Sequence, residues 1–369
     1  MATMVQAERA KVTVKELKGK VDPDWCPGCG DFGVLAALKQ AIVEAGLEPH
    51  MVLTVSGIGC SSNLPGYLNT YGMHTLHGRA LAVATGAQLA NHDLKIVVTG
   101  GDGDGYGIGG NHFVHAMRRN VDLTYIVMNN QIYGLTTGQL SPTSIKGMNT
   151  KSTPFGSVEN PINPIPLAIA AGASYVARGF TGQQRQLVEL IKGGLQHRGF
   201  ALIDTFSPCV TYNHDNTHEF FKQKTRKLED MGHDPTDLHG ALEKGWMWGD
   251  VIPIGLFWRR ENLPALDQLE PVLGEGGPLA HRPLGVSLDI AQALIKELMQ
   301  HSAPLRIADA THRGHDLLLR RGLQEPEILR VGHRGIGARD ALHRCVEVVE
   351  GLFSDQGGDL RVQAGETGA

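Results

Sequence analysis

Residues 95–110 read KIVVTGGDGDGYGIGG, a short run of β-branched residues that leads straight into a glycine-rich turn. The first part predicts a buried strand over Lys95–Gly100. Seven of the eleven residues from Gly100 to Gly110 are glycine, and glycines grouped in this way let the backbone approach a ligand closely. A helix is predicted from Gly109 to Arg119, and the positive end of its dipole would favour a phosphate group beside the turn.

The alternation of strand and helix extends on both sides of this turn. Three more apolar runs bounded by turn residues predict strands at Met51–Ile58, Leu123–Asn130 and Phe200–Phe206. Helical patterns occur at Gly33–Ala45, Gly78–Asn91, Ile165–Ala171 and Thr181–Gln196. Uninterrupted apolar strands that alternate with helices predict an α/β fold with a parallel sheet and helices on both faces. In such sheets ligands bind beyond the carboxyl ends of the strands, so we expect a site there.

The composition is that of an ordinary globular protein. The chain has 369 residues, of which 41% are hydrophobic and 20% charged, and its formal net charge is −4. This small negative charge gives no basic field for nucleic acid or an anionic membrane surface. The chain start lacks the apolar segment of a secretory signal, and no apolar stretch is long enough to cross a bilayer. We therefore expect a cytoplasmic protein without a nucleic-acid or membrane partner.

Three regions are predicted along the chain. Residues 1–215 contain the four predicted strands and form the α/β domain. Residues 216–270 complete the core, and Trp246–Arg260 within them is predicted as a strand or an amphipathic segment. Residues 271–369 form a C-terminal extension, whose tail at 356–369 is predicted to be disordered.

The cysteines indicate a metal site. An odd number of cysteines in a long chain without a secretory signal argues against a disulfide framework. Cys26 and Cys29 form a C-x-x-C loop, while Cys60 and Cys209 each follow a predicted strand. Four thiolates from three loops could hold a [4Fe–4S] cluster or a zinc ion, and the spacing favours the cluster because all-thiolate zinc sites usually pair two C-x-x-C loops. Unligated packing of Cys60 and Cys209 is the third alternative, and Cys345 is assigned to packing.

Oxygen ligands for a divalent cation follow two of the strands. Asp102 comes directly after one strand, and Asn130, 28 residues later, ends the next. Both side chains can bind Mg²⁺, with the backbone carbonyl of Ile132 as a third protein oxygen. The run Gly105–Gly110 also satisfies the dinucleotide fingerprint G-x-G-x-x-G, but it does not follow its strand directly, and the next strand ends in asparagine instead of an acidic residue. A magnesium–diphosphate site is therefore favoured over a dinucleotide site.

The Gly-Asp-Gly at 101–103 is followed by the 26 residues from Asp104 to Asn129 and then by Asn130, a pattern that closely resembles the thiamine diphosphate signature. Four further segments narrow the resemblance: WCPGCG at 25–30, GIGCS at 57–61, HTLHGR at 74–79 and YGLT at 133–136. Together they resemble the beta subunit of the 2-oxoacid:ferredoxin oxidoreductases, and the 2-oxoglutarate type (2-oxoglutarate synthase) is the most similar branch. The resemblance is specific over about residues 14–213 and is fainter up to about residue 270.

The resemblance implies a role for each candidate site residue. One [4Fe–4S] cluster would be bound by Cys26, Cys29, Cys60 and Cys209. Magnesium would be held by Asp102, Asn130 and the Ile132 carbonyl. Thiamine diphosphate would be contacted by Ile58, Gly59, Cys60, Ser61, His77, Gly103, Asp104, Gly134 and Leu135. Asn63 and Leu135 would face the substrate, and because many relatives place Arg or Lys where this chain has Asn63, the preferred 2-oxoacid stays open.

The resemblance also implies a thiamine diphosphate-binding domain of the pyrophosphate type and a reaction. The reaction would be coenzyme A-dependent oxidative decarboxylation of 2-oxoglutarate to succinyl-CoA and CO₂, in either direction, with single electrons passing through the cluster to ferredoxin. An alpha subunit would carry the pyrimidine-binding domain. Pyruvate or another 2-oxoacid is the alternative substrate. The alternatives of other classes are a non-oxidative thiamine diphosphate lyase with structural zinc and a non-catalytic metal-binding scaffold.

Overall fold

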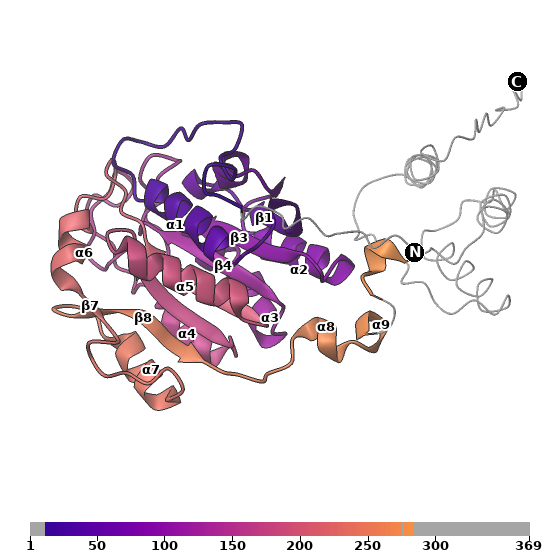
Figure 1. The fold of residues 1–369 in the computed structure, drawn as a ribbon. Coiled ribbons are helices and arrows are strands. Elements are labelled where there is room, and N and C mark those ends of the chain that lie inside the picture. Colours follow the sequence, from indigo (N-terminus) through magenta and orange to yellow (C-terminus); the bar gives the residue numbers. More distant parts are fainter. Residues whose placement is uncertain (1–11, 275–276, 283–369) are drawn as a thin grey trace, which may run out of the picture. The chain divides into compact units, whose positions relative to one another are not determined.

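A computed structural model describes residues 12–274 and 277–282 (Figure 1). All of these belong to one unit, which spans Met1–Arg282. Most of the predicted C-terminal extension, including Cys345 and the tail at 356–369, lies outside the described residues. Among the residues that are described, no helix has both the length and the apolar character needed to span a bilayer.

In the described part of the chain, eight strands form one sheet with the order β2-β1-β3-β4-β6-β5-β8-β7. Every neighbouring pair from β2 to β5 in this order is parallel, while β8 runs antiparallel to β5 and parallel to β7. The parallel sheet predicted from the sequence is therefore confirmed, with two further strands added at one edge. The strands are β1 (Val52–Ser56), β2 (Tyr71–His74), β3 (Lys95–Gly101), β4 (Leu123–Asn129), β5 (Tyr175–Phe180), β6 (Phe200–Phe206), β7 (Thr225–Lys227) and β8 (Ile252–Arg259).

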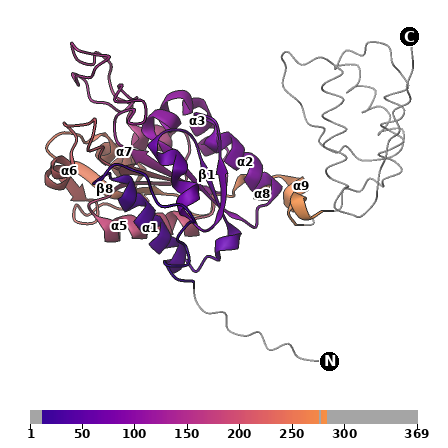
Figure 2. The same cartoon turned by 90° about the horizontal axis from the view of Figure 1, so that it is seen from above.

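Helices cover both faces of the sheet, as Figures 1 and 2 show. On one face lie α1 (Asp31–Glu44) and α5 (Gln184–Gln196), and on the other lie α2 (Ala80–Ala90), α3 (Gly110–Arg118) and α4 (Pro164–Ala170). Side chains of a strand alternate between the two faces: in β3, Ile96 and Val98 join one core and Val97 joins the other. Both faces are buried, which is why apolar residues predominate in these strands and do not alternate with exposed polar ones. The remaining helices are α6 (His218–Lys224), α7 (Leu238–Trp246), α8 (Leu266–Leu269) and α9 (Pro271–Gly274).

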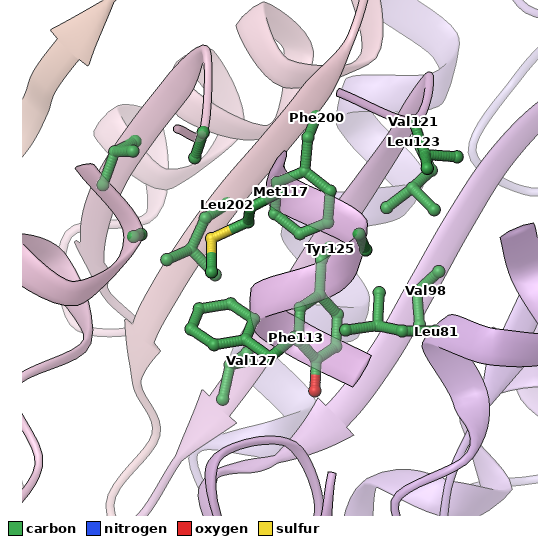
Figure 3. Packing of buried hydrophobic residues seen from close by; sticks show 14 of the residues in the cluster. Leu81, Val98, Phe113, Met117, Val121, Leu123, Tyr125, Val127, Phe200 and Leu202 are labelled. Carbon is green, nitrogen blue, oxygen red and sulfur yellow. The ribbon is translucent and has the colours of Figure 1, made fainter. Parts of the chain in front are cut away.

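The core beneath α3 is centred on aromatic side chains (Figure 3). Phe113 of α3 is fully buried. Its ring centroid lies 5.1 Å from that of Tyr106, 6.1 Å from that of Tyr125 and 6.3 Å from that of Phe200, all in tilted or edge-on arrangements. Such aromatic contacts add to the free energy gained by burying the rings. They fix α3, and with it the glycine-rich turn that precedes α3, against the sheet.

Two strands of the parallel region, β5 and β2, were not predicted from the sequence. β5 carries Arg178, which interrupts its apolar run although the side chain is buried. The Arg178 Nε atom lies 3.3 Å from Oδ2 of Asp204 on the neighbouring strand, and the guanidinium group lies over the rings of Phe206 and Phe257. β2 is the edge strand and all four of its residues are exposed, so it has no apolar pattern to detect.

The segment predicted as a strand or an amphipathic segment at Trp246–Arg260 contains β8, so the strand interpretation is correct. β7 was missed because three residues are too few to form a pattern. Both strands extend the same sheet, although they lie beyond residue 215. The division at residues 215 and 270 stays a prediction.

We expect Phe113→Ala to lower the free energy of unfolding by about 3–5 kcal/mol, because it removes a buried ring and leaves a cavity. Phe155→Ala is the matched control: Phe155 is fully exposed, so the same change there should alter stability by less than about 0.5 kcal/mol. Denaturant unfolding of the purified full-length chain measures both. Equal effects of the two substitutions would contradict the packing described here.

Candidate functional site

The carboxyl ends of β1, β3, β4 and β6 meet at one edge, because these four parallel strands are consecutive neighbours in the sheet. A cavity at this edge holds about 570 Å³ of empty space, including open solvent at its mouth. It is lined by every residue predicted to contact thiamine diphosphate or magnesium: Ile58, Gly59, Cys60, Ser61, His77, Asp102, Gly103, Asp104, Asn130, Ile132, Gly134 and Leu135.

Asp104 joins the loops that form this cavity. One oxygen of its buried carboxylate, Oδ1, accepts hydrogen bonds from the backbone N–H groups of Ile58 at 3.0 Å and Gly78 at 2.7 Å. The Nδ1 atom of His77 lies 2.7 Å from the same oxygen. A buried carboxylate needs such partners. Asp104 therefore connects the turn after β3 to the loop after β1 and to the loop before α2, and its Oδ1 atom faces protein groups.

Glycines keep the floor of the cavity open. A Cβ atom added to Gly57 would lie 1.9 Å from Oδ2 of Asp104, and one added to Gly103 would lie 2.2 Å from the ring of Tyr133. No larger residue fits either position without moving its neighbours. The Ser61 hydroxyl also lines the cavity and is buried without a hydrogen-bond partner. An open backbone with an unpaired hydroxyl suits a polar, phosphate-bearing ligand.

Asp102 is buried in the wall of the same cavity. Burial raises the pKa of its carboxyl group to about 6, although hydrogen bonds from the side chains of Ser141 and Thr143 and from the backbone N–H of Asn130 act in the opposite direction. The Thr143 hydroxyl lies 2.6 Å from Oδ2 of Asp102. A bound cation would favour the charged form of this group and offset the cost of its burial.

The predicted magnesium ligands fit this place. Asp102 and Asn130 directly follow the neighbouring parallel strands β3 and β4, and the side-chain oxygen of Asn130 accepts the backbone N–H of Ile132 at 3.0 Å. The three predicted ligands therefore belong to two segments that contact each other, and all of them line the cavity. A carboxylate, an amide and a carbonyl are the oxygen donors that Mg²⁺ takes together with phosphate oxygens. The magnesium site stays a prediction that this donor set supports.

The cysteine loops meet beside the cavity. The Trp25 indole N–H donates to the carbonyl of Cys60 at 2.6 Å, which connects the C-x-x-C loop to the loop after β1. The backbone N–H of Gly30 donates to the carbonyl of Pro208 at 3.1 Å, which connects it to the loop after β6. A Cβ atom added to Gly134 would lie 3.2 Å from Sγ of Cys60 and 3.7 Å from Sγ of Cys209.

The thiols also influence one another electrostatically. Burial, followed by the charges of Asp31, Cys209 and Cys26, raises the pKa of Cys60 to about 12. Burial is also the main cause of the strongly raised pKa of Cys29. Buried thiols of this kind stay protonated unless a metal centre stabilises their thiolates. The four predicted cluster ligands are therefore neighbours whose chemistry suits metal binding.

Within the described residues, no three His, Cys, Asp or Glu side chains surround one point as ligands of a single metal ion. A [4Fe–4S] cluster differs from a single ion because each cysteine binds a different iron atom, so the four cysteine sulfurs are separated by the width of the cluster. The [4Fe–4S] cluster stays a prediction supported by the meeting of the three loops.

Asn63 is the one predicted site residue outside both groups. It is exposed on the short helix Cys60–Tyr67 and does not line the cavity. Its contact with substrate stays a prediction. Conversely, Asp31, Ser141 and Thr143 belong to the site and were missed. Asp31 directly follows the cysteine loop, which was an available signal, whereas nothing in the sequence around Ser141 and Thr143 marks them.

The fold and cavity are those of a thiamine diphosphate-binding domain. The family model "Thiamine pyrophosphate enzyme, C-terminal TPP binding domain" matches residues 57–205, and the family model for the C-terminal part of the pyruvate ferredoxin oxidoreductase beta subunit matches residues 209–275. The chain belongs to the beta subunits of the 2-oxoacid:ferredoxin oxidoreductases, enzymes that also contain an alpha subunit. The predicted family is therefore confirmed.

Three relatives illustrate the similarity. The beta subunit of 2-oxoacid:ferredoxin oxidoreductase from Saccharolobus solfataricus is 49% identical over 66% of this chain and 84% of its own length. The 2-oxoglutarate oxidoreductase subunit KorB of Mycobacterium tuberculosis is 47% identical over 54% of this chain and 53% of its own length. A solved structure, 2-oxoglutarate:ferredoxin oxidoreductase from Magnetococcus marinus with 2-oxoglutarate, coenzyme A and succinyl-CoA bound, is 44% identical, with a TM-score of 0.70 over 79% of this chain and 97% of that one. These findings support the 2-oxoglutarate type.

We expect Gly57→Ala to disrupt the cavity, because the new methyl group would collide with the Asp104 carboxylate that joins three loops. The melting temperature should fall by several degrees, as for a loss of about 1–3 kcal/mol. Gly86→Ala is the control: no atom lies within 4 Å of an added Cβ there, and alanine favours a helix interior. A stability of Gly57→Ala equal to that of Gly86→Ala would refute the role given to Asp104.

Proposed function

We propose that this chain, with its alpha subunit, catalyses coenzyme A-dependent oxidative decarboxylation of 2-oxoglutarate. One 2-oxoglutarate and one coenzyme A thiol would give succinyl-CoA, CO₂, one proton and two electrons, and the electrons would leave singly through a [4Fe–4S] cluster to ferredoxin. One observation carries the proposal: Cys60 and Gly134 line the cavity, and the sulfurs of Cys60 and Cys209 lie against Gly134. An electron acceptor this close to the cofactor suits an oxidative reaction, whereas a plain decarboxylase needs none.

Thiamine diphosphate, when bound, supplies the electron sink that cleavage of a 2-oxoacid requires. In this chain Asp102, Asn130 and the Ile132 carbonyl would hold the magnesium ion that binds its diphosphate. The backbone at Gly103 and the free hydroxyl of Ser61 would contact the diphosphate oxygens. His77 and Asp104 would keep the surrounding loops in place, as their hydrogen bond indicates.

The cluster would be bound by Cys26, Cys29, Cys60 and Cys209, whose loops are joined by the hydrogen bonds of Trp25 and Gly30. Cys26 is exposed, whereas the other three are partly buried. The cluster would therefore have one side near the cofactor, at Cys60, and one side near solvent, at Cys26. This arrangement suits the transfer of electrons from the cavity to an external ferredoxin.

The alpha subunit would close the mouth of the cavity. Leu76, Ile108 and Leu135 expose 75%, 61% and 60% of their surfaces. Leu135 lines the cavity, Leu76 adjoins His77, which also lines it, and Ile108 packs against Gly78. Exposed apolar side chains gathered around a site are typical of an interface. A covering subunit would bury these side chains and exclude water from the reaction.

The choice of 2-oxoglutarate rests on the relatives, since the names of the Mycobacterium tuberculosis and Magnetococcus marinus proteins both specify it. Asn63 is neutral, so it would bind a substrate carboxylate by hydrogen bonding and not by charge. Pyruvate is the alternative substrate.

We expect the complex of the full chain and its alpha subunit, purified without oxygen, to contain about four iron and four acid-labile sulfide atoms per beta chain. Cys209→Ser should lose most of both, because it removes one cluster ligand. Cys345→Ser is the matched control and should keep the wild-type content. If the wild-type complex contains zinc and no acid-labile sulfide, the proposal is wrong, and a non-oxidative lyase with structural zinc is favoured.

The same complex should reduce ferredoxin, or a viologen dye in its place, when 2-oxoglutarate and coenzyme A are both present. We expect kcat/KM for 2-oxoglutarate to exceed that for pyruvate by at least about tenfold, a difference of about 1.4 kcal/mol in transition-state binding. Omission of coenzyme A should prevent turnover. A preference for pyruvate would change the substrate assignment, and no acceptor reduction with any 2-oxoacid would refute the oxidative reaction.

A further inference from the structure

We propose that Thr143, assisted by Ser141, is a positioning residue that holds the carboxylate of Asp102 in the orientation needed to bind magnesium. The inference rests on the proposed thiamine diphosphate site. It concerns a segment that no sequence motif identified, 41 residues after Asp102 along the chain.

The Thr143 hydroxyl makes a direct and buried contact with Asp102. Its Oγ1 atom lies 2.6 Å from Oδ2 of the carboxylate, and only 3% of Thr143 is exposed. The Ser141 hydroxyl belongs to the same turn and lies 3.4 Å from Oγ1 of Thr143. The Thr143 hydroxyl therefore holds a carboxylate that otherwise could rotate about its terminal bond, and Ser141 lies beside Thr143.

The turn that carries these hydroxyls is itself fixed to the end of β4. The Ser144 hydroxyl accepts the backbone N–H of Ser141 at 2.8 Å and donates to the carbonyl of Gln131 at 2.7 Å. The Gln131 side chain donates in return to the carbonyl of Thr143 at 3.0 Å. These bonds leave the turn little freedom relative to Asn130 and Ile132, the other two predicted magnesium ligands.

A buried network extends this support into the sheet. The Thr143 hydroxyl lies 3.0 Å from Oδ1 of Asn129, and the Asn129 amide donates to Asp204 at 3.0 Å. Asp204 pairs in turn with Arg178. All of these side chains are buried, so the position of Thr143 is determined by the central strands of the sheet.

The hydroxyl has two acceptors within reach and one proton to donate. When Asp102 is charged, the shorter bond to the carboxylate is the stronger one. Valine has the shape of threonine without the proton, so Thr143→Val would remove this bond and leave two buried acceptors facing each other. Loss of a hydrogen-bond partner of a metal ligand typically weakens metal binding about 10–100-fold.

The test uses the full chain co-expressed with its alpha subunit, with cofactor and metal removed by a chelator under anaerobic conditions. Titration calorimetry measures thiamine diphosphate binding at increasing Mg²⁺ concentrations. We expect Thr143→Val to raise the Mg²⁺ concentration at half-maximal binding by about 10–100-fold. Thr143→Ser keeps the hydroxyl and should stay within about threefold of the wild type, since the positioning bond is retained.

Thr150→Val is the matched control. It makes the same chemical change in the same loop, but the Thr150 hydroxyl contacts only Ser152 and Thr153 in the hydrogen bonds described, so its Mg²⁺ requirement should equal that of the wild type. The melting temperature without ligands separates positioning from folding: a Thr143→Val complex that melts normally but gains less stability from Mg²⁺ and thiamine diphosphate fits the proposal. If the Thr143→Val chain does not assemble with the alpha subunit, Ser141→Ala is tested in its place. We expect it to raise the Mg²⁺ concentration at half-maximal binding several-fold.

A wild-type Mg²⁺ requirement in Thr143→Val would overturn the inference, as would an equal defect in Thr143→Ser or Thr150→Val. If Ser141→Ala has to decide, an unchanged requirement in that variant has the same consequence. If the wild-type complex itself binds no thiamine diphosphate, the proposed function fails, which is a distinguishable result.

Discussion

The site depends on a single buried oxygen, Oδ1 of Asp104, which two backbone N–H groups and the His77 ring share. These contacts bring the loop after β1 and the loop before α2 onto the turn after β3. A buried carboxylate is costly without partners, and this cost makes the three-loop arrangement specific. It also explains Gly57, because any side chain there would occupy the space of the carboxylate.

The second constraint is the short distance between the cavity at the sheet edge and the loops that carry the cysteines. Cys60 belongs both to the wall of the cavity and to the group of cysteine loops, and its sulfur lies 3.2 Å from where a Cβ atom on Gly134, another wall residue, would be. In a sheet whose consecutive strands all end at one edge, a loop can serve both sites at once. The family to which the chain belongs performs oxidations of 2-oxoacids, for which this closeness is useful.

Much of this could be predicted from the sequence because the deciding patterns are local. Four strands were recognisable as short apolar runs, Asp102 and Asn130 directly follow strand ends, and Cys60 and Cys209 lie in the loops after two strands. β5 was missed because Arg178 looks like a surface residue until its partner Asp204, on another strand, is known. Thr143 was missed because its partner Asp102 is distant along the chain.

The sequence by itself determined the parallel sheet, the edge at which the site lies and the identity of the candidate ligands, since hydrophobic period and strand-end residues are properties of short segments. Only the tertiary structure decided how those ligands are supported: which hydroxyls hold Asp102, which donors surround Asp104, and that Asn63 lies outside the cavity. Such contacts join residues far apart in the chain, and their geometry is set by the packing of the sheet and not by any local pattern.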